Sequence, residues 1–218
     1  MTGISTYLVR PPKLIVDNNP LLLLLHGYGS NEADLFSFAA ELPDEYYVIS
    51  LQAPHDMQYG SYAWYSINFD ADASKFSDLD EARTSRDLVL STLDDLQKKY
   101  PIDAQAVTLI GFSQGAILSY ALALSYPERI QRVAALSGYL NPEIAAADYE
   151  ENNFASLQIF ASHGTVDQVI PVEWARKSPE ILTNLGVRVQ FKEYPIGHGV
   201  SPQNFYDLRE WLVATQVG

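Results

Sequence analysis

Five consecutive leucines, Leu21 to Leu25, are the feature of this sequence that most constrains its fold. A membrane span needs roughly 20 apolar residues, so a run of this length has to lie in a protein core instead. His26 and Gly27 end the run at once, which is typical of a strand rather than a helix. Because no polar residue interrupts it, we expect both faces of this strand to be covered, as in a parallel sheet with helices on both sides.

The rest of the chain alternates between short apolar segments and longer segments with helical character. Strands separated by helices of about ten residues or more are typical of βαβ units, which build a mostly parallel sheet. A length of 218 residues is enough for one core, so we predict a single α/β domain over residues 1–218. The expected strands cover residues 5–10, 21–25, 47–51, 106–110, 133–136, 157–161 and 187–194, and the expected helices cover residues 30–42, 78–100, 114–126, 173–185 and a segment starting at 201.

The composition excludes several classes of function. The chain contains no cysteine, which rules out disulfide scaffolds, thiolate metal sites and a cysteine nucleophile. Its 27 acidic and 14 basic residues give a formal net charge of −13, so nucleic acids and anionic membranes are unfavourable partners. Residues 1–10 lack the basic and apolar stretches of a signal peptide, and no apolar run is long enough to span a membrane. We therefore expect a cytoplasmic protein.

A nucleophile motif lies between an expected strand and an expected helix. Residues Gly111 to Gly115 read GFSQG and match the pattern G-x-S-x-G. A chance match in a loop is common, but a sharp strand-to-helix turn at this place would hold Ser113 in a strained conformation at the sheet edge. The two glycines leave room for the strand and the helix to pass closely, and the helix N-terminus stabilises developing negative charge. We therefore predict that Ser113 is a catalytic nucleophile.

A serine hydroxyl needs a general base, and the chain contains four histidines. Where a nucleophile lies on such a turn, an acid and then a histidine follow it along the chain. Only His163 and His198 follow Ser113. His198 lies between two glycines directly after the last expected strand, and we predict that it is the base. His163 comes too early for that order, and we expect it to form a hydrogen bond within its own loop.

The acid should lie between Ser113 and His198, in a loop that follows a strand. Asp167 meets this requirement because it comes shortly after the expected strand 157–161. Its predicted role is to hold the histidine tautomer and to stabilise the imidazolium. An aspartate in a loop can also be a turn residue or a helix cap. Three acidic residues in a polar segment that we expect to be solvated are rivals for the role: Asp148, Glu150 and Glu151.

A tetrahedral intermediate requires hydrogen-bond donors directed at its oxygen. We predict that one donor is the backbone N–H of Gln114, the residue after the nucleophile. The second is expected in the loop after an early strand, and we assign it to the backbone N–H of Tyr28, which lies between Gly27 and Gly29. The alternative is that these two glycines serve only a tight turn. His26 is expected to order this loop by hydrogen bonding.

Residues 60–72 are rich in aromatic side chains and lack a clear period, so we expect a long structured loop. Tyr62, Trp64 and Tyr65 are predicted to bind the substrate as walls of an acyl pocket. The alternative is that these aromatic side chains fill the core beneath the loop. Tyr139 and Leu140, which follow a later strand, are weaker candidates for the pocket.

One segment has the spacing of a calcium-binding loop. The residues at positions 1, 3, 5 and 12 of an EF-hand-like loop are Asp70, Asp72, Ser74 and Glu81. Position 6 requires glycine for a sharp turn, and this chain has Lys75 there. We therefore expect a solvated loop that leads into a helix cap, and we predict no metal site.

Together these motifs resemble the phospholipase/carboxylesterase family of α/β-hydrolases, which includes acyl-protein thioesterases and bacterial carboxylesterases. The resemblance spans nearly the whole chain. It implies the α/β-hydrolase fold with a minimal lid, activity on carboxylic esters or thioesters, no cofactor, and frequent homodimers. The segments that carry it are HGYGS (26–30), AWYSI (63–67), GFSQGA (111–116), HGTVDQVIP (163–171) and GHGVS (197–201).

Two residues depart from the pattern of this family. Ser66 stands where an aspartate often follows the aromatic pair, and Tyr28 stands where a smaller aliphatic residue is usual. Both positions fall where acyl groups are expected to bind. The departures therefore concern substrate preference rather than the reaction itself.

We predict a serine carboxylesterase that hydrolyses small or medium acyl esters through an acyl-enzyme. Two alternatives stay open at this point. The first is an acyl-protein thioesterase or lysophospholipase with the same catalytic residues and a longer acyl groove. The second is a catalytically silent hydrolase fold that binds a ligand, against which the sequence argues because none of the expected catalytic residues is missing.

Overall fold

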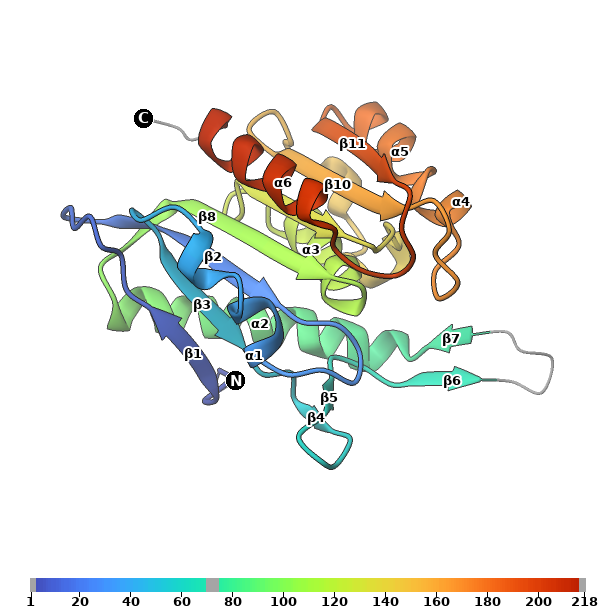
Figure 1. The fold of residues 1–218 in the computed structure, drawn as a ribbon, viewed down its shortest axis with the longest axis horizontal. Coiled ribbons are helices and arrows are strands. Elements are labelled where there is room, and N and C mark those ends of the chain that lie inside the picture. The colour runs from blue at the N-terminus through green and yellow to red at the C-terminus, as the bar shows by residue number, and fades with distance from the viewer. Residues whose placement is uncertain (1–2, 70–74, 216–218) are drawn as a thin grey trace.

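The computed structural model describes residues 3–69 and 75–215, and its centre is a seven-stranded sheet (Figure 1). From one edge to the other, the strands are β1 (Tyr7–Arg10), β3 (Tyr47–Leu51), β2 (Asn19–Leu25), β8 (Ile102–Phe112), β9 (Arg132–Leu136), β10 (Gln158–Gly164) and β11 (Arg188–Tyr194). β1 pairs antiparallel with β3, and all other neighbours are parallel. The predicted mostly parallel sheet is confirmed, and the loops after its parallel strands meet at one edge.

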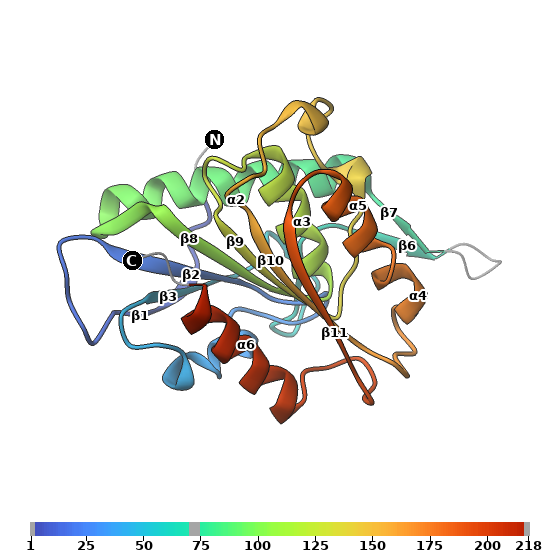
Figure 2. The same cartoon turned by 90° about the horizontal axis from the view of Figure 1, so that it is seen from above.

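Helices cover both faces of the sheet (Figure 2). The leucines of β2 alternate between two cores: Leu21, Leu23 and Leu25 face one, and Leu22 and Leu24 face the other. All five side chains are buried, which explains why the run contains no polar residue. The first core lies under α2 (Leu79–Lys99), α3 (Gln114–Ser125) and α5 (Ser178–Asn184), and the second lies under α1 (Ala33–Phe36) and α6 (Pro202–Ala214).

Short strands form two hairpins beside the main sheet. The expected loop over residues 60–72 contains parts of both, so it is more regular than predicted. Asp70, Asp72 and Ser74, which belong to the segment with calcium-loop spacing, lie outside the described residues. The hairpin strands are β4 (His55–Asp56) with β5 (Tyr62–Ala63), and β6 (Ile67–Phe69) with β7 (Lys75–Ser77).

Two expected helices are each divided into shorter pieces. After α1, the amide of Phe38 bonds to the carbonyl of Leu35, and the chain continues as the 3-10 helix η1 (Ala39–Glu41). The tighter spacing of these bonds ends the α-helix early. The expected helix 173–185 is divided into α4 (Val172–Ala175) and α5, because Pro179 lacks an N–H and its ring disfavours a continuous helix.

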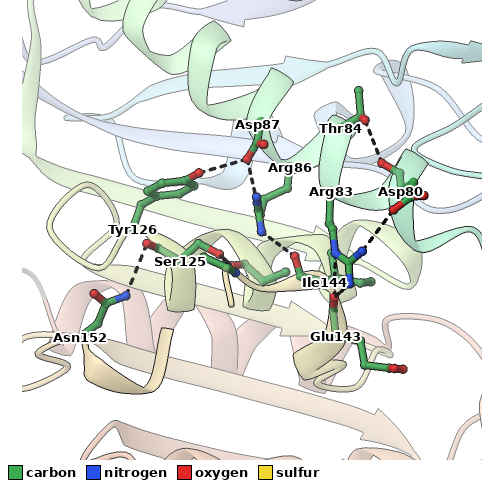
Figure 3. A network of polar contacts seen from close by, with 12 residues as sticks. Asp80, Arg83, Thr84, Arg86, Asp87, Ser125, Tyr126, Glu143, Ile144 and Asn152 are labelled. Atoms are coloured by element: carbon green, nitrogen blue, oxygen red, sulfur yellow. Dashed lines mark hydrogen bonds and ion pairs between the residues drawn. The ribbon is translucent and has the colours of Figure 1, made fainter. Parts of the chain in front are cut away.

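A network of polar contacts binds the long connection between β9 and β10, here called the excursion, to α2 (Figure 3). The excursion contains the 3-10 helices η2 (Pro142–Ile144) and η3 (Tyr149–Glu151). Arg86 is largely buried, and its Nη1 donates a hydrogen bond of 2.8 Å to the carbonyl of Ile144. Its Nε donates to Asp87, which also accepts the hydroxyl of Tyr126 at 3.1 Å. The excursion is therefore held on the helix by a buried guanidinium.

His26 joins three segments at the carboxyl edge of the sheet. Its Nε2 accepts the backbone N–H of Ala53 at 3.1 Å, so its Nδ1 carries the hydrogen and donates to the carbonyl of Gly27 at 2.8 Å. The indole N–H of Trp64 donates to the carbonyl of His26 at 2.8 Å. Burial lowers the pKa of His26, which favours this neutral form. The expected role of His26 in ordering its loop is thus confirmed.

The start of α3 touches the end of β2 through backbone atoms. A Cβ added to Gly115 would lie 2.0 Å from the carbonyl oxygen of Leu25, and one added to Gly111 would lie 2.3 Å from the carbonyl oxygen of Gly115. Real atoms do not approach so closely, so only glycine permits this contact. The two glycines of the nucleophile motif are therefore required by packing.

We expect Gly115→Ala to destabilise the protein by about 3 kcal/mol or more, because the added methyl group has to displace backbone rather than a side chain. Gly197→Ala is the matched control, since a Cβ at Gly197 meets nothing within 4 Å. It should change the free energy of unfolding by less than about 0.5 kcal/mol. Chemical denaturation of both variants measures the difference, and equal effects would contradict this account of the contact.

The stability of the protein should depend on pH through His26. Its pKa in the folded state lies below the ordinary value of 6.5, so the unfolded chain takes up this proton first as the pH falls. Above pH 6.5 the neutral ring contributes its full stabilisation. This stabilisation is lost progressively as the pH falls from 6.5 towards the folded-state pKa. Between about pH 8 and pH 5, the wild type should lose more stability than His26→Gln, as measured by denaturation at each pH. Parallel curves for the two proteins would refute the assignment.

Candidate active site

Ser113 lies at the sharp turn between β8 and α3. Its backbone has φ 52° and ψ −114°, a strained conformation for a residue with a side chain. The turn is held because the N–H of Ser113 donates to the carbonyl of Leu136 in the neighbouring strand at 2.8 Å. The residue is 8% exposed. Its hydroxyl is thus presented at the carboxyl edge of the sheet, as the motif predicts.

Three residues that are distant in the sequence form a chain of hydrogen bonds. Nε2 of His198 lies 2.9 Å from Oγ of Ser113, and Nδ1 of His198 lies 2.6 Å from Oδ2 of Asp167. A carboxylate oxygen accepts, so Nδ1 carries the hydrogen and Nε2 of the neutral ring accepts the serine hydroxyl. The structure therefore brings together the predicted nucleophile, base and acid in the order that proton transfer needs.

Asp167 is held by backbone amides as well as by the histidine. Its Oδ1 accepts the N–H groups of Val169 at 2.7 Å and Ile170 at 2.9 Å. Burial acts to raise the pKa of Asp167, but the bonds from His198 and these two amides hold the pKa below its ordinary value. The carboxyl group is therefore ionised at neutral pH. The three rival acidic residues are exposed at or beside η3: Asp148, Glu150 and Glu151.

The two residues predicted to supply an oxyanion hole line the same cavity as Ser113. The amide of Gln114 is at the first position of α3, where an N–H has no acceptor within the helix. The loop that carries Tyr28 is held in place by β5, because the N–H of Gly29 donates a hydrogen bond of 2.9 Å to the carbonyl of Tyr62. Both backbone segments therefore flank the nucleophile.

The side chain of Gln114 has a role that the sequence did not indicate. Its Oε1 accepts the N–H of Trp64 at 2.8 Å, and its Nε2 donates to the carbonyl of Tyr65 at 2.7 Å. The amide group thus binds the backbone of the aromatic segment through both of its polar atoms. A glutamine directly after a nucleophile could have suggested such a contact only if the neighbouring segment had been known.

A cavity of about 250 Å³ opens beside the serine, and its wall is mostly apolar. Tyr65 forms part of this wall. Tyr62 and Trp64 do not line it, so the structure corrects two of the three predicted substrate-binding residues. Trp64 is fully buried in the core, with its ring centroid 5.5 Å from that of His26. The aromatic segment therefore serves both as core and as wall, through different residues.

Several wall residues were not predicted as pocket residues. Ile117 lies one helical turn after the nucleophile, and this spacing could have identified it. Trp174 packs edge-on against Tyr139 with ring centroids 5.2 Å apart, and both lie in the wall. Tyr139 was a weaker candidate, whereas Trp174 belongs to a helix whose position the sequence did not indicate. Leu140, the other weak candidate, is buried in the core.

The described residues 3–69 and 75–215 contain no cluster of three His, Asp or Glu side chains suited to a metal ion. In the same part of the chain, no helix has both the length and the hydropathy needed to cross a bilayer.

This chain matches one family profile and several curated proteins. The sequence profile of the phospholipase/carboxylesterase family matches residues 13–216. A rice protein (Oryza sativa subsp. japonica) named "Probable carboxylesterase" is 32% identical over 112 residues, which cover 51% of this chain and 42% of that protein. Acyl-protein thioesterase 1 of Emericella nidulans is 30% identical over 132 residues, which cover 59% of this chain and 55% of that protein. The chain thus spans about half the length of the curated relatives it matches.

Solved structures share the fold over almost the whole chain. A carboxylesterase from Bacillus cereus superposes with a TM-score of 0.83 at 21% identity and covers 96% of this chain and 94% of its own. Acyl-protein thioesterase 2 from Zea mays superposes with a TM-score of 0.76 at 22% identity and covers 96% of this chain and 98% of its own. The α/β-hydrolase fold is therefore confirmed, and the chain belongs to the phospholipase/carboxylesterase family.

Proposed function

We propose that this protein is a serine carboxylesterase in which Ser113 is the nucleophile, His198 the general base and Asp167 the acid. The observation that carries the proposal is the unbroken hydrogen-bond chain from Asp167 through His198 to Ser113 at the mouth of an apolar cavity. A strained serine or a buried aspartate on its own does not indicate catalysis, because each can serve a purely structural role. The convergence of all three groups at one sheet edge is the arrangement that activates a hydroxyl group.

The proposed reaction follows from the directions of these bonds. The hydroxyl of Ser113 attacks the ester carbonyl carbon while Nε2 of His198 takes its proton. Asp167 stabilises the resulting imidazolium through Nδ1. The imidazolium then protonates the departing alcohol, which leaves an acyl group on the serine. Water deacylates the enzyme by the same route, with His198 again accepting and returning a proton.

The developing oxyanion is proposed to bind the backbone N–H groups of Gln114 and Tyr28. Donors directed at this oxygen contribute about 10²–10³ in rate each. The amide of Gln114 also lies at the start of α3, where the helix dipole favours negative charge. Gly29, with φ +75°, gives the loop after Tyr28 the left-handed turn that it needs.

The size of the cavity favours small or medium acyl groups. At about 250 Å³ it lies just below the range of typical ligand sites, which span about 300–1,000 Å³. An acyl-protein thioesterase or lysophospholipase with a long groove is the second candidate, because relatives of this chain are named acyl-protein thioesterase 1 and lysophospholipase-like protein 1, and the same residues would cleave a thioester. A silent ligand-binding protein is disfavoured, because the three groups are aligned for proton transfer.

We expect Ser113→Ala to lower kcat/KM for p-nitrophenyl esters by about 10⁴-fold or more, because no other group can form the acyl-enzyme. A fluorophosphonate probe should label the wild type and fail to label the variant. Ser50→Ala is the matched control, since Ser50 is also buried, in β3, and its hydroxyl has no partner among the described residues. If Ser113→Ala stays folded and active, or if the wild type resists the probe, the proposed function is wrong.

Acyl-chain preference should follow the volume of the cavity. Across a series of p-nitrophenyl esters and matched thioesters, kcat/KM should peak at short or medium chains and fall for palmitoyl. Ile117 lies in the cavity wall, so Ile117→Ala should move the peak to longer chains and Ile117→Phe should move it to shorter ones. A wild-type optimum at palmitoyl would instead support the thioesterase or lysophospholipase, and an unchanged optimum in both variants would remove Ile117 from the acyl site.

A further inference from the structure

A second histidine lies directly behind the proposed catalytic acid. His163, near the end of β10, is fully buried, and its Nε2 lies 2.9 Å from the carbonyl oxygen of Ile170. The expected hydrogen bond within its own loop is thus confirmed. Because a carbonyl oxygen can only accept, Nε2 carries the hydrogen. The same nitrogen lies 3.2 Å from Oδ2 of Asp167, which is also the oxygen that accepts the bond from His198.

His163 and Asp167 hold the two sides of one turn. The N–H of Ile170 donates to Oδ1 of Asp167, and the carbonyl of Ile170 accepts from His163. The first part of the turn is held by the segment before His198, because the N–H of Val166 donates to the carbonyl of Ile196 at 3.2 Å. At the far end of the turn, the imidazole is the group that binds the Ile170 carbonyl. The position of the aspartate carboxylate therefore depends on His163.

The ring of His163 meets the turn through one nitrogen. Its Nδ1 is buried and has no hydrogen-bond partner among the described residues. With its hydrogen on Nε2, the ring directs the positive end of one N–H dipole at the turn and towards Oδ2 of Asp167.

The other charges around His163 are already paired. Glu193 lies beside it in the register between β10 and β11. Both carboxylate oxygens of Glu193 accept from the guanidinium of Arg176, at 2.7 and 2.8 Å. Asp167 is bound by His198 and two backbone amides. His163 thus completes an existing arrangement rather than neutralising an unpaired carboxylate.

We propose that His163 is a positioning residue, which fixes the turn from Asp167 to Ile170 and thereby aims Oδ2 of Asp167 at Nδ1 of His198. This inference rests on the proposed function. When the turn is released, the carboxylate moves away and no longer selects the tautomer of His198 whose Nε2 can accept the serine proton. A misplacement of about 1 Å in a catalytic arrangement can cost about 10²-fold in rate.

The test compares three substitutions of His163. Gln places an amide N–H near the position of Nε2 of His163, so it can still bind the carbonyl of Ile170. Asn places its amide near the position of Nδ1 instead, and Leu has no N–H donor at all. We expect His163→Leu and His163→Asn to lower kcat by about 10²-fold with little change in KM, and His163→Gln to recover most of that loss. The acid limb of the kcat/KM profile reports the free base. This acid limb should move to lower pH in the Leu and Asn variants, because the imidazolium of His198 is no longer stabilised by a well-placed Asp167. In the Gln variant the acid limb should stay in place.

Folding is measured separately by thermal unfolding of each variant. A folded Leu variant with wild-type kcat overturns the inference, and so does a loss of activity without movement of the acid limb, since a purely structural role would not change the pH profile. If the Leu variant does not fold, equal kcat values for the Gln and Asn variants overturn it. These results leave the proposed function intact, because that function is tested separately by the Ser113→Ala variant and the fluorophosphonate probe.

Discussion

The backbone contact between the start of α3 and the end of β2 is the constraint on which the rest of the site depends. It leaves no space for a side chain at Gly115, and it forces the strand-to-helix turn into the conformation in which Ser113 has a positive φ. The strain at the serine is maintained because the surrounding sheet is buried on both faces and cannot relax locally. The same contact sets the first turn of α3, so that Gln114 offers its amide on one side and its side chain on the other.

Around that fixed turn, the remaining loops are held by hydrogen bonds to backbone atoms. The side chain of Gln114 binds the backbone at Trp64 and Tyr65, the ring of His26 binds the segment just after β3, and a backbone bond joins the acid loop to the loop that carries His198. A Cβ at Gly164 would meet the carbonyl of Gly197 at 2.3 Å, which shows how closely those two loops pack. The proposed catalytic groups thus lie on turns and loops, but these segments are packed as closely as a core.

The sequence predicted the elements whose signals are local. Each main strand and the long helices followed from apolar runs and caps, and the G-x-S-x-G pattern marked the turn at Ser113. The sequence did not predict the break at Pro179, which lies within an otherwise helical pattern, or the hairpins in the aromatic segment. The wall of the cavity could not be read locally either. Tyr65 and Trp64 are adjacent, and only the direction of each side chain separates a wall residue from a core residue.

Three residues of the cavity wall are attached to parts of the framework that carry none of the proposed catalytic groups. Ile67 comes from a small hairpin, Trp174 from a short helix after the acid loop, and Tyr139 from the loop after β9, and none of these three supports the hydrogen-bond chain from Asp167 to Ser113. These three residues can therefore be exchanged to reshape the cavity without removing a hydrogen bond from that chain, whereas Val169 and Ile170 both line the cavity and bind Asp167.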